Sequence, residues 1–324
     1  MAERIQALRH WLEGTVGLAG FDLQPASGDA SFRRYFRVTV DSGSWIAMDA
    51  PPDKEDSGPF VSIARQLAEL GLHVPRIKAA DLQQGFLLLE DLGSRHYLDV
   101  LDEQSADRLY GDAMGALLVV QACGPRDVLP PYDSVLLMRE MELFREWLLG
   151  RHLQLDLSSA DQQMLDDTFE FLVGSALQQP QVCVLRDYHS RNLMLTASNN
   201  PGILDFQDAV IGPFTYDLVS LLKDCYIRWP RARVEDWVAG YFELAVQSGV
   251  LRAEHEDQFL RWFDLMGVQR HLKAAGIFAR LKHRDGKAGY LSDIPRTLGY
   301  VLELGATYRE LKALAGLCET KVLW

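Results

Sequence analysis

The chain has 324 residues, of which 48% are hydrophobic and 24% are charged, and these proportions are typical of a globular protein with one large or two ordinary domains. A formal net charge of −12 argues against a nucleic-acid-binding protein, because such a protein needs a basic surface. The charges within residues 1–13 argue against a signal peptide, no uncharged apolar run approaches a membrane span, and the four cysteines lack metal-type spacing. We therefore expect a cytoplasmic protein that binds neither membranes nor nucleic acids, with a monomer as the default.

The first part of the chain combines two predicted helices with several predicted strands. Apolar residues at helical spacing predict a helix over residues 2–13. A second helix is predicted over residues 59–70, because Pro59 suits a first turn and Gly71 suits a C-terminal cap. Short apolar runs predict a hairpin and further strands at residues 23–40, 44–50, from 74 onward and 85–93.

Two segments of this first part suit a bound nucleotide. Residues 26–31 form a turn of small residues before a strand, which is most simply an ordinary hairpin turn. The alternative is a loop whose backbone N–H groups approach phosphates closely, and Arg33, Arg34 and Arg37 beside it favour that alternative. Residues 85–93 run from an apolar strand into a turn, as the hinge of a kinase does. The Glu90 carbonyl and the Leu92 N–H would then bond the adenine edge, although a plain core strand has the same pattern.

The rest of the chain is mainly helical. Apolar spacing predicts helices at residues 101–123, 134–149, 160–177, 216–229, 234–248, 255–282 and 291–316. We therefore predict an α+β protein of two lobes. Residues 1–92 would form a small β-rich lobe, and residues 93–324 a larger helical lobe that includes a catalytic loop at 184–217. The active site is expected in the cleft between the lobes.

Three polar residues at the ends of short apolar runs carry the chemistry of this loop. Asn192 follows Asp187 by five positions, and Asp205 follows it by eighteen. This is the arrangement of a kinase, in which one carboxylate faces the acceptor hydroxyl while an amide and a second carboxylate hold magnesium on the nucleotide. A β-hairpin with turn-favouring residues is the alternative for the first pair. The three residues together favour phosphoryl transfer.

Further candidates for acceptor binding follow Asp187 and Asp205. His189 could bond the acceptor or the phosphoryl group, or be a plain turn histidine. Arg191 could bind a carboxylate-bearing sugar; otherwise it is solvated or pairs with Asp217 or Asp208. Gln207 and Asp208 could bond sugar hydroxyls.

A helix around residues 269–280 mixes basic and apolar residues. At 3.6 residues per turn Arg270 and Lys273 lie near one another, with Phe278 about two turns on. The two cations could flank the acceptor and favour an anion there. A solvent-exposed basic face is the usual explanation for such a run, and the role beside the acceptor is the alternative.

With these residues assembled, the chain resembles the aminoglycoside phosphotransferase/choline kinase superfamily, the small-molecule relatives of the protein kinases. The resemblance is strongest in residues 186–192, 203–209 and 212–218. It implies a protein-kinase-like fold, ATP and Mg²⁺ as cofactors, Asp187 as the catalytic base, and Asn192 and Asp205 as the metal ligands. It also implies that Asp217 is a structural or site-orienting carboxylate.

Three segments are similar to a narrower group, the anomeric sugar kinases of bacterial cell-wall recycling. They are residues 31–37, 48–52 and 269–281. Those enzymes phosphorylate the C1 hydroxyl of N-acetylmuramate and N-acetylglucosamine with ATP, so the resemblance implies an ATP-dependent sugar kinase of peptidoglycan recycling. Another small acceptor, such as an aminoglycoside, a choline-like amine or homoserine, is the first alternative. A nucleotide-binding sensor without catalysis is the second, and a purely structural or interaction protein the third.

The sequence departs from the superfamily at two positions. Leu185 stands where a histidine usually precedes the catalytic aspartate, and Met48 stands where the third strand usually carries a lysine for the phosphates. Phosphate charge would then be met by Arg33, Arg34 or Lys54. The predicted nucleotide-binding residues are Ser31, Phe32, Arg33, Met48, Glu90, Asp91 and Leu92.

Overall fold

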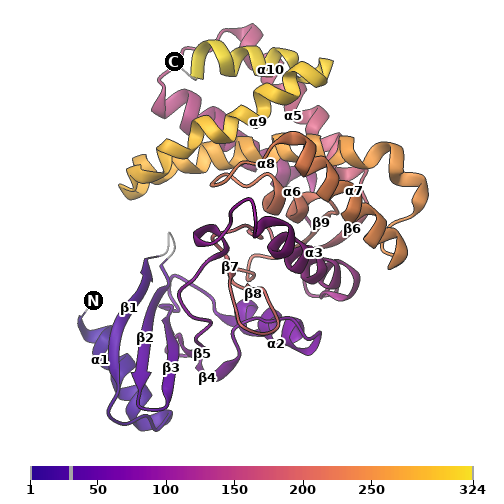
Figure 1. Ribbon diagram of the computed structural model, residues 1–324. Helices are drawn as coiled ribbons and strands as arrows, with labels where there is room; N and C mark the ends of the chain where they lie inside the picture. Colours follow the sequence, from indigo (N-terminus) through magenta and orange to yellow (C-terminus); the bar gives the residue numbers. More distant parts are fainter. Residues whose placement is uncertain (1, 29–31, 323–324) are drawn as a thin grey trace. The chain divides into compact units, whose positions relative to one another are not determined.

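The computed structural model describes residues 2–28 and 32–322, and the chain divides into two compact units (Figure 1). The first unit consists of Met1–Arg95 and Met194–Gln207, and the second of His96–Leu193 and Asp208–Trp324. A small antiparallel sheet dominates the first unit and helices dominate the second, which confirms the predicted α+β class. The predicted boundary after residue 92 stays a prediction; the segment Met194–Gln207 packs with the first unit.

The first unit contains a five-stranded sheet in which every pair of neighbours is antiparallel (Figure 1). The spatial order is β1-β2-β3-β5-β4. Its strands are β1 (Asp22–Gly28), β2 (Arg34–Val40), β3 (Gly43–Asp49), β4 (Ile77–Asp81) and β5 (Phe86–Glu90).

One face of this sheet is covered by the N-terminal helices α1 (Ala2–His10) and η1 (Trp11–Thr15). Alternate residues of a strand point to the same face, and Phe36 and Val38 of β2 accordingly share a core with Phe86 of β5. The shared core contains Leu8, Trp11, Leu12, Leu23, Phe36, Val38, Ala47, Phe86 and Leu88.

Helix α2 (Gly58–Glu69) fastens the segment Met194–Gln207 to the first unit. The ring of Phe60 on this helix stacks on the ring of Phe206, with centroids 5.0 Å apart. The N–H of Ile203 donates to the carbonyl oxygen of His73 at 2.7 Å. The residue Asp205 is therefore carried by the first unit.

The second unit is built from helices and one short two-stranded sheet. In this sheet strand β6 (Gln181–Val184) pairs antiparallel with β9 (Val210–Pro213). Strands β7 (Leu193–Met194) and β8 (Gly202–Ile203) form a separate two-stranded sheet. The helical part of the second unit is larger. Its helices are η2 (Tyr97–Asp99), α3 (Ala106–Cys123), α4 (Ser134–Leu143), η3 (Phe144–His152), α5 (Ser159–Leu177), α6 (Tyr216–Leu222), α7 (Arg231–Gln247), η4 (Ala253–His255), α8 (Glu256–Asp285), η5 (Ala288–Asp293), α9 (Ile294–Thr307), η6 (Arg309–Leu311), α10 (Lys312–Leu317) and η7 (Cys318–Val322).

Helix α8, drawn in orange in Figure 1, is the centre of the second unit. It packs against α4, η3, α5, α6, α9 and η5, and residues 262–273 in its middle part are all buried, the polar and charged ones included. Gly276 allows a close approach of α8 to α4. A Cβ atom on Gly276 would lie 2.3 Å from the carbonyl carbon of Leu143. The glycine therefore sets how near α8 comes to the end of α4.

The predicted helix from residue 216 to about Trp229 is wrong at its end, because α6 stops at Leu222. The following segment makes long-range bonds that a helix would not allow. The Lys223 carbonyl oxygen accepts from Nε2 of His271 at 2.8 Å, and the Asp224 carboxylate accepts from Ser190. Burial lowers the pKa of His271 to about 3, so its ring is neutral.

Among the residues that the structure describes, no helix is long and apolar enough to cross a membrane.

Candidate active site

The predicted catalytic loop begins where β6 ends. Asp217, a fully buried residue of α6, holds the start of this loop through its two carboxylate oxygens. They accept the backbone N–H groups of Leu185 at 2.6 Å and of Arg186 at 2.9 Å. Arg186 has a φ of +73°, which is uncommon for a residue other than glycine, and it directly precedes Asp187. The turn that presents Asp187 is thus held by a buried carboxylate, which agrees with the orienting role expected of Asp217.

Asp187 lies half-buried among cations. Burial acts to raise the pKa of its carboxyl group, but Lys273, His189, Arg270 and Arg186 outweigh burial and hold that pKa below its ordinary value. Within the described part of the chain, no ion pair or hydrogen bond engages the Asp187 carboxylate itself. The side chain is therefore ionised at neutral pH and able to accept the proton of a hydroxyl group.

Asn192 and Asp205, the predicted metal ligands, are each held by a local bond. Nδ2 of Asn192 donates to the carbonyl oxygen of Asp187 at 3.0 Å, so the amide oxygen is the atom that Asn192 would offer to a cation. Asp205 has a φ of +60°, and its Oδ1 accepts from Nε2 of Gln207 at 2.7 Å. An amide oxygen and a carboxylate fit a hard divalent cation. Asn192 belongs to the second unit and Asp205 to the first, and their joint role stays a prediction.

The predicted phosphate-binding residues follow the loop between β1 and β2. Ser31 lies outside the described residues. The side chain of Phe32 is 65% exposed, and its N–H donates to Oε1 of Glu55 at 3.2 Å. The guanidinium of Arg33 forms an ion pair with the same carboxylate at 3.2 Å. Arg33 therefore has a carboxylate partner.

The third strand places Met48 in the interior. Its side chain is fully buried, and the residue lies opposite Tyr35 of β2 and Leu87 of β5. The next residue, Asp49, is also fully buried and forms ion pairs with Arg34 and Arg4. Arg34 is thus also matched by a carboxylate at this strand.

The predicted hinge follows the buried strand β5. Glu90 is half-buried, and its carboxylate lies 3.7 Å from Nε2 of His73. The Asp91 carboxylate accepts from Nε of Arg37 at 2.7 Å and from Oγ of Ser44 at 2.7 Å. Burial raises the pKa of Asp91, but the bonds to Arg37 and Ser44 lower it by more. The Asp91 carboxylate is therefore already hydrogen-bonded to Arg37 and Ser44. The next residue, Leu92, is half-buried.

The predicted acceptor residues of the catalytic loop lie against aromatic rings. His189 packs edge-on against Tyr226, with ring centroids 5.5 Å apart, and burial lowers its pKa. The guanidinium of the exposed Arg191 lies 4.7 Å from the centre of the Tyr226 ring and 5.4 Å from that of Tyr290. Asp208 is exposed, and its carbonyl oxygen accepts from Arg186 at 3.4 Å.

The expected solvent-exposed basic face on the helix around residues 269–280 is wrong. Arg270 and Lys273 are only 5% and 7% exposed, because α8 is surrounded by other helices. Nζ of Lys273 lies 3.1 Å from the Glu140 carboxylate and donates to the hydroxyl of Tyr216 at 2.9 Å. Glu140 also forms an ion pair with Arg186, so this buried carboxylate ties α8 to the catalytic loop.

Sequence reasoning missed Glu140 and Asp224. Oδ2 of Asp224 accepts from the N–H of Ser190 at 2.9 Å and from its Oγ at 2.5 Å, which fixes the middle of the catalytic loop. Both carboxylates lie in predicted helical segments far from residues 184–192 in the sequence. Neither belongs to a local motif, so no sequence signal pointed to them.

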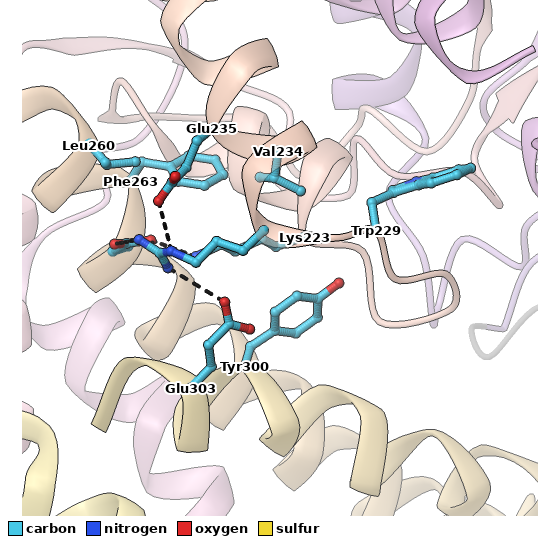
Figure 2. Close-up of a pocket in the computed structure, with 10 residues that line it drawn as sticks. Lys223, Trp229, Val234, Glu235, Leu260, Phe263, Tyr300 and Glu303 are labelled. Atoms are coloured by element: carbon cyan, nitrogen blue, oxygen red, sulfur yellow. Dashed lines mark hydrogen bonds and ion pairs between the residues drawn. The ribbon is translucent and has the colours of Figure 1, made fainter. Parts of the chain in front are cut away.

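A small pocket elsewhere in the second unit contains none of the predicted site residues (Figure 2). Its charged groups form ion pairs with one another. Nζ of Lys223 lies 2.6 Å and Nη2 of Arg231 2.9 Å from the Asp264 carboxylate, and Arg231 also pairs with Glu235 and Glu303. We assign this cluster a structural role, since Lys223 adjoins the anchor Asp224.

These features are those of a phosphotransferase of the kinase-like class: an antiparallel sheet, a helical unit, and a carboxylate on a loop that Asp217 and Asp224 hold in place. The phosphotransferase enzyme family matches residues 22–260, and the chain belongs to this family. It is therefore an enzyme of phosphoryl transfer, a chemistry that uses a nucleoside triphosphate with a divalent metal ion.

Relatives of nearly the same length carry one common name, N-acetylmuramate/N-acetylglucosamine kinase. The protein of that name from Pseudomonas putida is 47% identical over 97% of this chain and 95% of its own length. The corresponding Pseudomonas aeruginosa protein is 48% identical over 97% and 96%. The Neisseria meningitidis protein is 42% identical over 96% and 93%.

Solved structures show the same fold at low sequence identity. The choline kinase LicA from Streptococcus pneumoniae has a TM-score of 0.66 at 11% identity, covering 94% of this chain and 99% of its own. An ADP-bound aminoglycoside phosphotransferase has a TM-score of 0.60 at 15% identity, covering 92% and 97%. These similarities confirm the predicted kinase-like fold.

Proposed function

We propose that this enzyme transfers the γ-phosphoryl group of ATP to the anomeric C1 hydroxyl of N-acetylmuramate and N-acetylglucosamine. The product would be the sugar 1-phosphate, in the cytoplasmic recycling of peptidoglycan. One observation carries the proposal: relatives with that substrate pair in their names are 42–48% identical over nearly the whole chain. The presence of Asp187, Asn192 and Asp205 together supports it, because a non-catalytic relative has no chemical need for all three.

In the proposed mechanism Asp187 orients the C1 hydroxyl and accepts its proton as the sugar oxygen bonds to the γ-phosphorus atom and ADP departs. The cations around Asp187 keep its carboxylate ionised for this task. Asn192 and Asp205 would hold magnesium through oxygen atoms, and magnesium bound there would neutralise phosphate charge. Asp217 and Asp224 keep the loop in place through the bonds to Leu185, Arg186 and Ser190.

We propose that the acceptor lies against the catalytic loop and helix α8. His189 and Arg191 of the loop, Arg270 and Lys273 of α8, and Gln207 and Asp208 after Asp205 are its candidate contacts. Lys273 already forms an ion pair with Glu140, so its main role is to lower the pKa of Asp187 and keep that carboxylate ionised. For ATP, the candidate contacts remain Phe32, Arg33, Met48, Glu90, Asp91 and Leu92.

An acceptor panel tests the proposed function. ADP release is measured with ATP, magnesium and, in turn, N-acetylmuramate, N-acetylglucosamine, glucosamine, choline, kanamycin and homoserine. We expect turnover with the two N-acetylated sugars. Turnover with an amine acceptor instead would keep the fold and mechanism and overturn the assigned substrate. Nucleotide binding without turnover on any member would favour a sensor.

A further inference from the structure

Arg270 is a buried guanidinium without a matching carboxylate. Only 5% of the residue is exposed, and its Nη1 donates to Sγ of Cys225 at 3.5 Å. Its Nε is buried and has no hydrogen-bond partner among the described residues. No carboxylate in the described part of the chain lies within ion-pair distance, 4 Å, of its nitrogen atoms.

The other buried cations of this unit are matched. Arg186 and Lys273 share Glu140, and Lys223 pairs with Asp264. A buried charge is costly unless it is paired and hydrogen-bonded. A guanidinium has five N–H donors in a planar fork that suits a carboxylate or a phosphoryl group. Arg270 therefore has unused capacity to bind an anion.

Arg270 lies where an anion that it binds would be near the catalytic loop. Asp187 and Asp224 interact electrostatically with the Arg270 guanidinium, and the charge of Arg270 also acts to lower the pKa of His189. The bond from Arg270 to Cys225 places its guanidinium next to Asp224, whose carboxylate holds Ser190 of the catalytic loop, and the Arg270 charge also acts on the Asp187 carboxylate.

Aromatic residues close to this place form a wall that suits the apolar face of a sugar ring. Phe278, two turns after Arg270 on α8, stacks on Tyr290 with centroids 5.7 Å apart and packs against Tyr226 at 6.1 Å. We call Tyr226, Phe278 and Tyr290 the aromatic wall. Arg191 of the catalytic loop lies over both of its tyrosines, so the wall adjoins the loop. Small-molecule sites commonly combine aromatic surfaces with few polar anchors.

We propose that Arg270 binds a substrate oxyanion beside Asp187, while the aromatic wall contacts the acceptor ring. The inference rests on the proposed function and names the anchor of its site. The oxyanion has two possible sources, the carboxylate of N-acetylmuramate and the transferring phosphoryl group. N-acetylglucosamine has no carboxylate, so the two sugars separate these sources.

The test uses Arg270→Met and the conservative Arg270→Lys, with Arg261→Gln as the matched control. Arg261 lies on the same helix and pairs at the surface with Glu310. For each protein kcat and KM are measured with both sugars, together with the melting temperature. A carboxylate anchor predicts that Arg270→Met raises KM for N-acetylmuramate about tenfold or more and leaves N-acetylglucosamine unaffected. A phosphoryl anchor predicts a similar fall in kcat for both sugars, partly restored in Arg270→Lys.

The melting temperature separates a functional from a structural role. Removal of an unmatched buried charge should leave it unchanged or raise it, whereas a structural arginine would lower it. Kinetic constants within twofold of the wild type on both sugars would overturn the inference, and so would an activity loss that follows loss of folded protein. Wild-type inactivity on both sugars would refute the proposed function instead. In that case stabilisation by inorganic sulfate decides for Arg270, because Arg270→Met should lose it relative to Arg261→Gln.

Discussion

At the scale of single residues, Asp187 carries the chemistry. Asp187→Asn keeps the shape of the side chain but removes its ability to accept a proton. We expect kcat to fall by orders of magnitude while nucleotide affinity stays near the wild-type value, since the metal-ligand candidates are unchanged. Initial rates and an ATP-binding titration measure the two effects. Near-normal turnover would remove Asp187 from its assigned role.

Asp217 shows how burial and loop support compete at one residue. Burial raises its pKa to about 7, although the N–H groups of Leu185 and Arg186 and the charge of Arg270 act to lower it. The folded protein therefore holds a proton on Asp217 between pH 4 and 7, where the unfolded chain has released it. This stabilising contribution is complete at low pH and is lost as the pH rises through about 7.

For Asp217 we predict that the unfolding free energy depends on pH more steeply in the wild type than in Asp217→Asn. Between pH 5 and 7 the unfolding free energy of the wild type should fall relative to that of Asp217→Asn, by at most about 1.4 kcal/mol per pH unit. Urea unfolding of both proteins across this range measures it. Parallel curves would show that the folded and unfolded proteins hold the same charge on Asp217.

At the scale of secondary-structure elements, the approach of α8 to α4 brings Lys273 to Glu140. Gly276→Ala would place a methyl group against the backbone of Leu143, and we expect it to cost about 1–3 kcal/mol of stability. Gly174→Ala on α5 is the matched control, because a Cβ there meets nothing within 4 Å and alanine favours a helix by up to about 1 kcal/mol. Equal melting temperatures for the two variants would contradict this account of the packing.

The helices also show which features could not be predicted from the sequence. Hydrophobic periodicity and the motifs around Asp187 and Asp205 were enough to predict the class of fold and the proposed chemistry. The end of α6 was mispredicted because Asp224 is held by Ser190 and the Lys223 carbonyl by His271, partners distant in sequence. The burial of Arg270 and Lys273 was missed for a similar reason. Their charges read locally as a solvated face, whereas the neighbours that bury them come from other helices.

At the scale of the whole molecule, the proposed dependence on magnesium rests on Asp205. We expect Asp205→Ala to abolish the magnesium dependence of nucleotide binding, because a carboxylate is the ligand that contributes charge to the metal. Nucleotide titrations with and without magnesium measure it. Asp167→Ala, an exposed aspartate on α5, is the control and should behave as the wild type. An unchanged magnesium effect in Asp205→Ala would exclude Asp205 as a ligand.

The most direct test of the central claim is the identity of the phosphorylated atom. The wild-type enzyme is incubated with ATP, magnesium and N-acetylglucosamine labelled with ¹³C at C1, and the product is followed by phosphorus NMR. We predict a new phosphate signal that is split by the labelled C1 atom, as an anomeric phosphate requires. A phosphate on another hydroxyl, or no transfer to the sugar, would contradict the account.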